Sequence, residues 1–558
     1  MSSTEVPQEP LKSSCDSVPA ETEDKALELA RRRVSAAELV KSTLYNAKSS
    51  SVDKFYTINE MEFRTPLMHH GSQDTETITV TVRAVLSEAK GADCTDTVRR
   101  NSEIKLDFSK PIAAYLVGGP GSDNPPTANP ALNDFYLEKG FQILYMDYRG
   151  TGSSHELRAD QLDKVFTKGV EIQKECLLAN FEGGDEKLAE YLTHFRQDNI
   201  VRDLEAVRLF LSGEKSKGTK KNAEQVKLTL IGQSYGGWVA FSYLSFYPNA
   251  LDMVLVTGGV PPIGKTAETV YRQTFTATIN ANYTFYEKNP GHGEIARKVV
   301  EWVETNTTGG NHIQMPGGGH LTTGRFLCLG RTLGTTGGYK KVAKALNECL
   351  ADITSLGKLS DETLKNIEGW IRFEERVLYC VLQEAIYTDI GCGPSGWAAE
   401  KVARELPEFS WLNDGKLPAG NITFYAEHVF NFHYDQFKSL KHLRGAANIL
   451  AKKDDWAPLF DLVRLRKNKV PIASLCYKND IFIDAELSEK TKKATTSICQ
   501  EVDETLMHTA VKDMSGKVLP RLWRILGDAV ADSKGIDRSG VLDSDRKNAA
   551  TLLACISR

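Results

Sequence analysis

The chain lacks the long apolar runs of membrane proteins and the paired cysteines of many secreted ones. None of its hydrophobic stretches approaches the roughly 18 uninterrupted apolar residues that a membrane span needs. Its 10 cysteines are scattered between Cys15 and Cys555 without a CxxC pair. Such scattering favours reduced, mostly buried thiols over a disulfide framework or a zinc site. We therefore expect neither a membrane protein nor a disulfide scaffold.

Charge of one sign and metal-binding motifs are also missing. Lysine and arginine number 69 against 73 aspartates and glutamates, and a net charge of −4 gives no indication of nucleic-acid binding. The 11 histidines form no HExxH or similar spacing, so no metal is predicted. The adjacent pair His69 and His70 lies in a polar stretch and is expected to be solvated. The N-terminus has no basic start followed by an apolar segment, and a cytoplasmic protein is therefore expected.

The middle of the chain alternates between strand and helix patterns. Four short aliphatic runs each end at glycine or a polar turn, as buried parallel strands do, and they cover residues 111–119, 141–150, 226–234 and 251–259. A helical repeat of apolar residues over 198–211 precedes the third run. This alternation predicts an α/β protein with a doubly wound, mostly parallel sheet.

The flanking segments divide the chain further. Residues 1–50 begin as a polar tail, and their spacing predicts a helix within Ala26–Ala47. Residues 55–67 and 75–86 have the alternation of antiparallel strands. After Pro262 the pattern is helical until a strand returns within 470–484, so the helices form an insertion into one fold. The predicted parts are therefore residues 1–50, a first core part 51–262, a helical cap 263–450 and a second core part 451–558.

One serine lies in a motif with a strong chemical meaning. Gly232-Gln233-Ser234-Tyr235-Gly236 follows a predicted strand directly and precedes a predicted helix. Glycines on both sides allow the sharp strand-to-helix turn that exposes a serine hydroxyl at the edge of a sheet. A GxSxG pattern occurs often by chance, but chance rarely supplies both flanking elements. We interpret Ser234 as a nucleophile.

A glycine-rich turn after an earlier strand is the predicted oxyanion loop. In Gly118-Gly119-Pro120-Gly121 the small residues leave backbone N–H groups free to face a developing oxyanion. The N–H groups of Gly119 and Tyr235 would be the donors. The alternative is an ordinary glycine turn.

A second loop motif, residues 146–154, follows the strand predicted within 141–150. Its charged residues Asp147 and Arg149 can tie adjacent loops together through charge-assisted hydrogen bonds. We interpret this motif as one that fixes loops, not as a catalytic one.

The acid and the base of a triad follow the nucleophile along the chain in this type of fold. Asp480 lies just past the strand predicted within 470–484, and His508 is the only histidine downstream of it. Asp484 is the alternative acid, and Asp480 is favoured because it is nearer the end of the strand. The predicted triad is Ser234, Asp480 and His508.

Four motifs in this order and spacing, GGPG, DYRGTGSS, GQSYGGW and TGGVPP, resemble the prolyl aminopeptidases (proline iminopeptidases), particularly their larger fungal-type members. The resemblance extends over roughly residues 55 to 530. It implies an α/β-hydrolase fold and a serine aminopeptidase that releases N-terminal proline, or a similar small residue, from peptides. It implies a peptide partner with a free N-terminus, no cofactor, and neither nucleic acid nor membrane as a partner, and it leaves a homo-oligomer open.

The resemblance also implies a substrate site. Two glutamates, Glu384 and Glu427, match positions that hold the substrate amine in smaller members, whereas on sequence alone they read as helix-surface residues. Gly118 and Pro120 are assigned to the same site. The chain departs from the family pattern at Val117, at Asn479 and in the Thr-Ala pair after His508, although no residue of the predicted triad is lost.

Two other functions are consistent with the same residues. A carboxylesterase or amidase could use this triad on a small acyl substrate, because one fold hosts many chemistries. A binding protein without catalysis could retain the hydrolase fold. A requirement for a free amine separates the aminopeptidase from the esterase.

Overall fold

The computed structural model describes residues 20–69, 76–89, 98–101, 103–158, 178, 181–217, 225–307, 312–538 and 547–557. Its centre is a 10-stranded sheet. The strands are β1 (Glu38–Lys48), β2 (Phe55–Pro66), β3 (Thr77–Ala89), β4 (Val98–Asn101), β5 (Ile112–Leu116), β6 (Gln142–Met146), β7 (Leu228–Gln233), β8 (Leu251–Thr257), β11 (Ile472–Tyr477) and β12 (Ile498–Asp503). Their order across the sheet is β12-β11-β8-β7-β5-β6-β3-β2-β1-β4.

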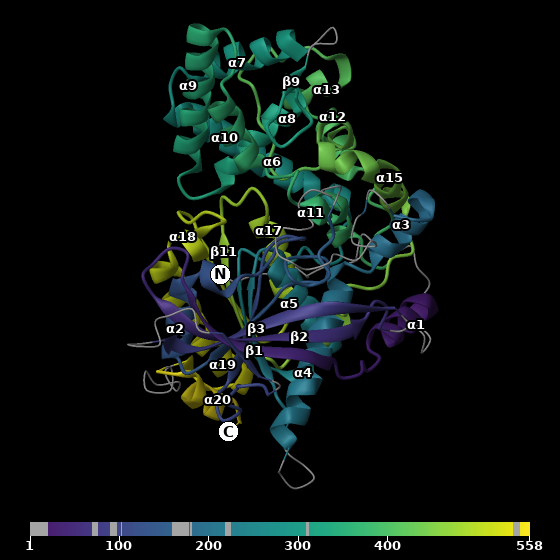
Figure 1. Cartoon of the computed structure of the whole chain (residues 1–558), viewed down its shortest axis with the longest axis vertical. Coiled ribbons are helices and arrows are strands. Elements are labelled where there is room, and N and C mark those ends of the chain that lie inside the picture. Colours follow the sequence, from purple (N-terminus) through teal and green to yellow (C-terminus); the bar gives the residue numbers. More distant parts are fainter. Residues whose placement is uncertain are drawn as a thin grey trace, which may run out of the picture.

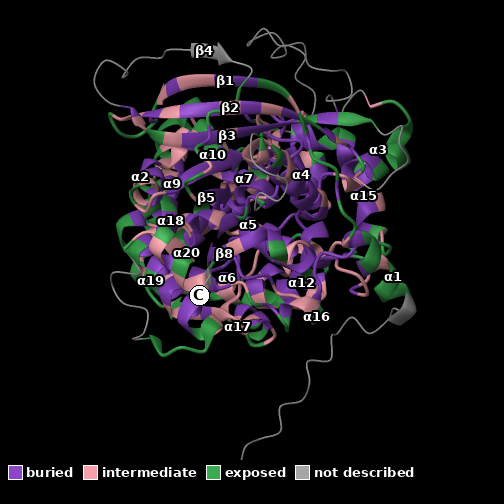
Figure 2. Cartoon of the chain, turned by 90° about the horizontal axis from the view of Figure 1, so that it is seen from below, coloured by how far each residue is buried: buried purple, intermediate pink, exposed green. Residues whose placement is uncertain are grey.

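The sheet has a parallel part and an antiparallel part. The strands from β12 to β6 pair in parallel, while β3 pairs antiparallel with β6, and β2, β1 and β4 continue antiparallel. All residues of β5 and β6 are buried, whereas β1 near the sheet edge mixes exposed and buried residues (Figure 2). The predicted mostly parallel sheet with antiparallel strands before it is confirmed.

Helices cover both faces of this sheet. Alternate residues of β5 point to opposite sides, so that Ile112 belongs to one hydrophobic core and Ala113 to the other. Helices α4 (Gln197–Ser216) and α5 (Tyr235–Phe246) supply side chains to the first core. The second core receives side chains from α2 (Pro130–Glu138), α19 (Ser515–Lys534) and α20 (Ala549–Ser557). The sheet is therefore doubly wound.

Between β8 and β11 the regular elements of the described chain are helices and a small hairpin of β9 (Ile313–Gln314) and β10 (His320–Leu321). Its α-helices are α6 (Ala267–Lys288), α7 (His292–Thr307), α8 (Thr323–Leu327), α9 (Gly338–Leu356), α10 (Asp361–Ile371), α11 (Val377–Leu382), α12 (Ala398–Glu405), α13 (Trp411–Asp414), α14 (His433–Gln436), α15 (Arg444–Lys452) and α16 (Leu462–Leu465). Figure 1 shows α6 to α10, with α12 and α13, gathered at one end of the molecule above the sheet. We call residues 267–452 the helical region. The division into domains stays a prediction.

The N-terminal segment differs from its prediction. The helix α1 spans Ala20–Ala30, and the chain then forms β1 instead of continuing as a helix to Ala47. β1 pairs with β2 along almost its whole length, and the Asn59 amide of β2 donates a 2.8 Å hydrogen bond to Ser42 of β1. Weak helix propensity does not compete with a continuous ladder of sheet hydrogen bonds. Residues 38–48 therefore belong to the core sheet.

Cysteine chemistry also departs from expectation at one position. Cys392 is disulfide-bonded, so the prediction of reduced thiols is wrong there. Five other cysteines are free and buried, namely Cys328, Cys349, Cys380, Cys476 and Cys499. Among the described residues, no helix is both long enough and apolar enough to span a membrane.

Candidate active site

Ser234 stands at a strained turn between β7 and α5. Its φ of 54° and ψ of −127° are rare for a residue with a side chain. The glycines around it are required by close packing: a Cβ on Gly236 would lie 1.9 Å from the Leu116 carbonyl oxygen, and one on Gly237 would lie 1.8 Å from the Gly259 carbonyl oxygen. The turn therefore rests directly on β5 and on the loop after β8, which fixes the position of the serine hydroxyl.

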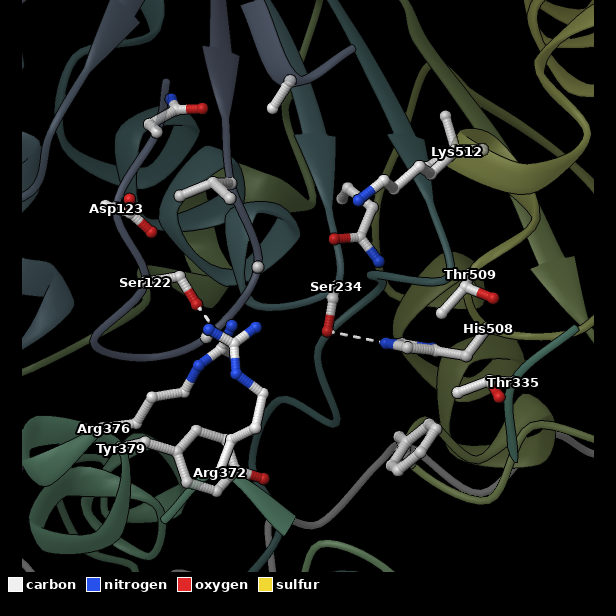
Figure 3. A pocket seen from close by; sticks show the side chains of 18 of the residues that line it. Ser122, Asp123, Ser234, Thr335, Arg372, Arg376, Tyr379, His508, Thr509 and Lys512 are labelled. Atoms are coloured by element: carbon white, nitrogen blue, oxygen red, sulfur yellow. Dashed lines mark hydrogen bonds between the residues drawn. The ribbon is translucent and has the colours of Figure 1, made fainter. Parts of the chain in front are cut away.

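The structure brings the three predicted triad residues together. His508 Nε2 lies 2.8 Å from Ser234 Oγ, and its Nδ1 lies 2.6 Å from Asp480 Oδ2 (Figure 3). Asp480 follows β11, and His508 lies between β12 and α18 (Ala510–Asp513). The other candidate, Asp484, caps α17 (Ala485–Lys493) by accepting the Leu487 N–H at 2.7 Å. The geometry therefore favours Asp480 as the partner of His508.

Neighbouring backbone groups orient Asp480 toward His508. Asp480 is buried, and its Oδ1 accepts the backbone N–H groups of Phe482 at 2.9 Å and Ile483 at 3.2 Å, so Oδ2 is left for the imidazole. Burial opposes protonation of His508, but the charge and hydrogen bond of Asp480, with the charge of Glu427, outweigh it and raise the pKa of the imidazole. A carboxylate placed in this way stabilises an imidazolium.

The loop containing Gly118 and Gly119 is held by Asp147. One oxygen of this carboxylate accepts the Asn124 N–H at 2.8 Å, and the other accepts from Arg83 at 2.8 Å. The Asn124 amide in turn donates to the Tyr115 carbonyl oxygen at 2.9 Å. The interpretation of Asp147 as a residue that fixes loops is confirmed.

Two backbone groups near Ser234 suit the predicted oxyanion site. Tyr235 is the first residue of α5, and the first N–H groups of a helix have no partner within it. Ser234, at the helix N-cap, makes no capping hydrogen bond with its side chain. Gly119 lines the same cavity as Ser234.

Arg149 fixes a second set of loops. It is fully buried, and its Nε and Nη2 each donate a 2.7 Å hydrogen bond to Asp203 on α4, while its Nη1 donates to the carbonyl oxygens of both Leu67 and His194. The predicted role in fixing loops is confirmed.

His69 also lies 2.8 Å from Asp203 with its side chain only 2% exposed, so the expectation that it is solvated is wrong. The buried carboxylate attracts this imidazole, and His70 lies outside the described residues.

A cavity of about 460 Å³ opens at Ser234. The core contributes Ser234, His508 and the loop of Gly118 and Gly119 to its wall. The helical region contributes further residues to the wall, including Arg331, Trp370, Arg372, Arg376, Tyr379 and Glu427. Figure 3 labels Arg372, Arg376 and Tyr379 among them. A site formed between a sheet and an inserted region is a common place for a small substrate.

Comparisons with known proteins identify the family to which the chain belongs. Residues 116–283 match a family model described as the α/β-hydrolase fold. The proline iminopeptidase of Aeromonas sobria is 31% identical over 467 residues, which cover 84% of this chain and 96% of that protein. The chain belongs to the proline iminopeptidase family. It is therefore a serine hydrolase with the α/β-hydrolase fold.

Two further relatives place the family match in context. Proline iminopeptidase aneH of Aspergillus aculeatus is 29% identical over 472 residues, which cover 85% of this chain and 94% of that protein. The crystal structure of a proline iminopeptidase from Mycobacterium smegmatis shares 10% identity, covers 84% of this chain and 98% of its own, and has a TM-score of 0.37. A score of this size supports no inference about activity.

The two glutamates predicted from the family resemblance are placed differently. Glu427 lines the cavity, where its Oε2 accepts the Tyr379 hydroxyl at 2.7 Å and its Oε1 accepts from Gln383 at 3.3 Å. Burial raises the pKa of Glu427. Glu384 does not line this cavity, and its Oε1 accepts the Ala399 N–H at 2.9 Å at the start of α12. Burial raises the pKa of Glu384 to about 7.

The other predicted substrate-site residues, and two of the positions that depart from the family pattern, lie at or near the cavity. Gly118 lines the cavity, whereas Pro120 is buried outside its lining. Val117 takes part in the lining through its place beside the glycines. Thr509, which follows His508, accepts the Thr336 N–H at 3.1 Å, so the departure there links the histidine loop to the helical region.

Sequence reasoning missed the polar residues that the helical region supplies. Arg331, Arg376 and Tyr379 line the cavity, and none of them is predicted from the sequence as a site residue. An arginine directly before an apolar helix, as Arg376 is before α11, was the available signal. Which cavity such a residue faces depends on how the helices fold back over the core.

Proposed function

We propose that this protein releases N-terminal proline, or a similar small residue, from peptides through an acyl-enzyme on Ser234. The proposal rests on the hydrogen bonds that link Ser234, His508 and Asp480. These residues lie at a cavity that the Glu427 carboxylate also lines. The family membership supports it, because the relatives are proline iminopeptidases.

In the proposed mechanism His508 Nε2 takes the proton of the Ser234 hydroxyl as its oxygen attacks the substrate carbonyl. Asp480 holds the imidazole in the required tautomer and stabilises its charged form. The N–H groups of Gly119 and Tyr235 donate hydrogen bonds to the tetrahedral oxyanion. His508 then gives its proton to the leaving amine. Water, deprotonated by His508, attacks the acyl-enzyme carbonyl, and the proton returns to the Ser234 oxygen as the released amino acid leaves.

Glu427 is the proposed ligand of the substrate amine. An N-terminal proline carries a secondary ammonium, and a carboxylate in a partly buried cavity binds such a cation by charge-assisted hydrogen bonds. The cation would also compensate the cost of ionising a buried carboxyl group. Glu384 faces backbone N–H groups of α12 and is assigned no substrate contact.

The test compares a proline amide with its N-acetyl derivative. The free amine should be cleaved and the acetylated form should be nearly inert, since it lacks the charge and adds bulk near Glu427. Glu427→Gln should lower kcat/KM for the free amine by about tenfold or more, as expected for a charge-assisted contact. Ser234→Ala should lose on the order of 10⁴-fold in kcat without unfolding.

Glu362→Gln is the matched control, because Glu362 is an exposed glutamate of α10 outside the cavity lining. It should leave kcat/KM unchanged. Equal cleavage of the free and acetylated substrates would favour an esterase or amidase, and near-normal turnover by Ser234→Ala would remove the serine mechanism.

A further inference from the structure

Two arginines of the cavity wall, Arg331 and Arg376, form no ion pair with a carboxylate among the described residues, although the charge of Arg331 acts to lower the pKa of Glu427. Arg376 Nη1 donates to the neutral Ser122 hydroxyl at 3.3 Å, and Figure 3 shows this guanidinium on the side of Ser234 opposite to His508. Arg331 lies over the Tyr379 ring at 5.4 Å, and its Nε is buried without a hydrogen-bond partner. Within the described part of the chain neither guanidinium forms an ion pair, whereas the neighbouring Arg372 pairs with Glu375 at 2.8 Å.

The cavity wall as a whole carries more positive than negative groups. Its lining contains Arg331, Arg372, Arg376 and Lys512, against Asp123 and Glu427. Burial, followed by the charges of Arg331 and Arg372, lowers the pKa of Arg376 to about 10, which still leaves it protonated near neutral pH. Clustering guanidinium groups at a partly buried wall costs free energy, and an anionic ligand would offset that cost.

Charges of opposite sign are therefore available to one ligand. Tyr379 connects them, because its hydroxyl binds Glu427 while its ring lies under Arg331. A volume of about 460 Å³ lies within the range of small-molecule sites, which is roughly 300–1,000 Å³. A short peptide, with an ammonium at one end and a carboxylate at the other, has this charge pattern.

We propose that Arg331 and Arg376 bind a carboxylate on the leaving-group side of the substrate, so that the enzyme prefers short prolyl peptides that carry one. Guanidinium groups suit this ligand because their planar N–H pairs match the two oxygens of a carboxylate. The inference rests on the proposed release of N-terminal proline. The carboxylate can come from the C-terminus of a dipeptide or from an acidic side chain.

Three peptides distinguish these sources: Pro-Gly, its amide Pro-Gly-NH2, and Pro-Asp-NH2, whose only carboxylate is in the side chain. The native enzyme should cleave Pro-Gly with a kcat/KM about tenfold or more above that of Pro-Gly-NH2. A high value for Pro-Gly alone assigns the subsite to the terminal carboxylate, and a high value for Pro-Asp-NH2 extends it to acidic side chains. Equal values for all three would overturn the inference.

Variants test the two arginines separately. Arg376→Gln and Arg331→Gln should each lower the ratio of kcat/KM for Pro-Gly over Pro-Gly-NH2 by about fivefold or more, and Arg376→Lys should retain part of it. Arg272→Gln, at an exposed arginine of α6 that pairs with Glu268, is the control and should keep the native ratio. Circular dichroism of each variant excludes misfolding, and the native ratio remains decisive if one variant does not fold.

Failure of this inference is distinguishable from failure of the proposed function. If Pro-Gly-NH2 is cleaved at a rate that Ser234→Ala abolishes, but the carboxylate adds nothing, only the arginine subsite is wrong. An unchanged ratio in both glutamine variants has the same meaning. If none of the three peptides is cleaved, the release of N-terminal proline is itself wrong.

Discussion

Asp480 and Asp484 are neighbours in the sequence, and their surroundings differ in a way that predicts different effects of substitution. Asp480 faces His508, whereas Asp484 caps α17. Asp480→Asn should lower kcat by roughly 10⁴-fold, since an amide no longer holds the required imidazole tautomer. Asp484→Asn should leave kcat almost unchanged, because asparagine is also a good N-cap residue. Steady-state kinetics with a proline amide measures both, and the opposite ranking would move the triad acid to Asp484.

The pH dependence of the reaction should report His508. Its imidazole must be neutral to accept the serine proton, and Asp480 and Glu427 raise its pKa against the effect of burial. We therefore expect kcat/KM to fall on the acid side as the pH drops through a value above 6.5, the ordinary value for histidine. Removing the charge of Glu427 destabilises the imidazolium, so Glu427→Gln should move this limb to lower pH.

The measurement is a pH profile of kcat/KM for a proline amide, with Glu362→Gln as the exposed control. An acid limb that stays in place, or moves to higher pH, in Glu427→Gln would contradict the assigned coupling. The profile is independent of the overall loss of activity in that variant, because only the midpoint is compared.

The three side chains that are hydrogen-bonded to one another, Ser234, His508 and Asp480, could be predicted from the sequence because motif context and chain order point to them. Ser234 lies in a motif that demands a strand before it and a helix after it, and chain order leaves His508 as the single histidine available downstream. Glu384 is assigned only through the family resemblance, and the place of Arg376 before an apolar helix does not show which cavity it faces. Their positions depend on how an α-helical stretch folds against the core, and one of these two side chains faces the cavity while the other faces α12.

At the level of elements, burial decided which strands were predictable. Strands β5 to β8 and β11 are short apolar runs because helices cover both faces of the sheet there, and each was predicted. β12 was not predicted, since most of Ile498–Asp503 is only partly buried and its polar residues resemble a loop. The sequence pattern predicts a helix where β1 lies, because the extended conformation of β1 depends on pairing with β2, which the local pattern does not contain.

The role of Asp147 and Arg149 in fixing loops could be predicted because both residues are charged. Arg149 and Asp147 stand directly after an apolar strand, and a charged residue in that position has to find a partner among adjacent loops. His69 carried no comparable signal, because its burial depends on Asp203 of α4, far away in the sequence. Local sequence patterns do not identify the partner of a single polar residue when that partner is far away in the sequence.

At the scale of the whole molecule, segments that are far apart in the sequence meet at one buried carboxylate. Asp461 has no exposed side-chain surface. Its Oδ2 accepts a 2.9 Å hydrogen bond from Nε of Arg31, the residue that follows α1. Its Oδ1 accepts the Arg464 N–H at 3.0 Å and so caps α16. Arg464 in turn donates to the Phe246 carbonyl oxygen at the end of α5. The N-terminal segment is thereby anchored to the chain that follows the helical region.

This anchor should contribute to stability and not to chemistry. Asp461→Ala removes a helix cap and leaves Arg31 without its ion-pair partner, and we expect a loss of about 1–3 kcal/mol in the free energy of unfolding. The melting temperature should therefore fall measurably, while kcat/KM for a proline amide at 25 °C stays unchanged, because Asp461 does not line the cavity. Arg31→Gln should have a smaller effect, since the α16 cap remains. Arg33→Gln, at an exposed neighbouring arginine, should have none. Thermal denaturation of the four proteins measures these differences, and an Asp461→Ala melting temperature equal to that of Arg33→Gln would mean that this anchor contributes nothing measurable to stability.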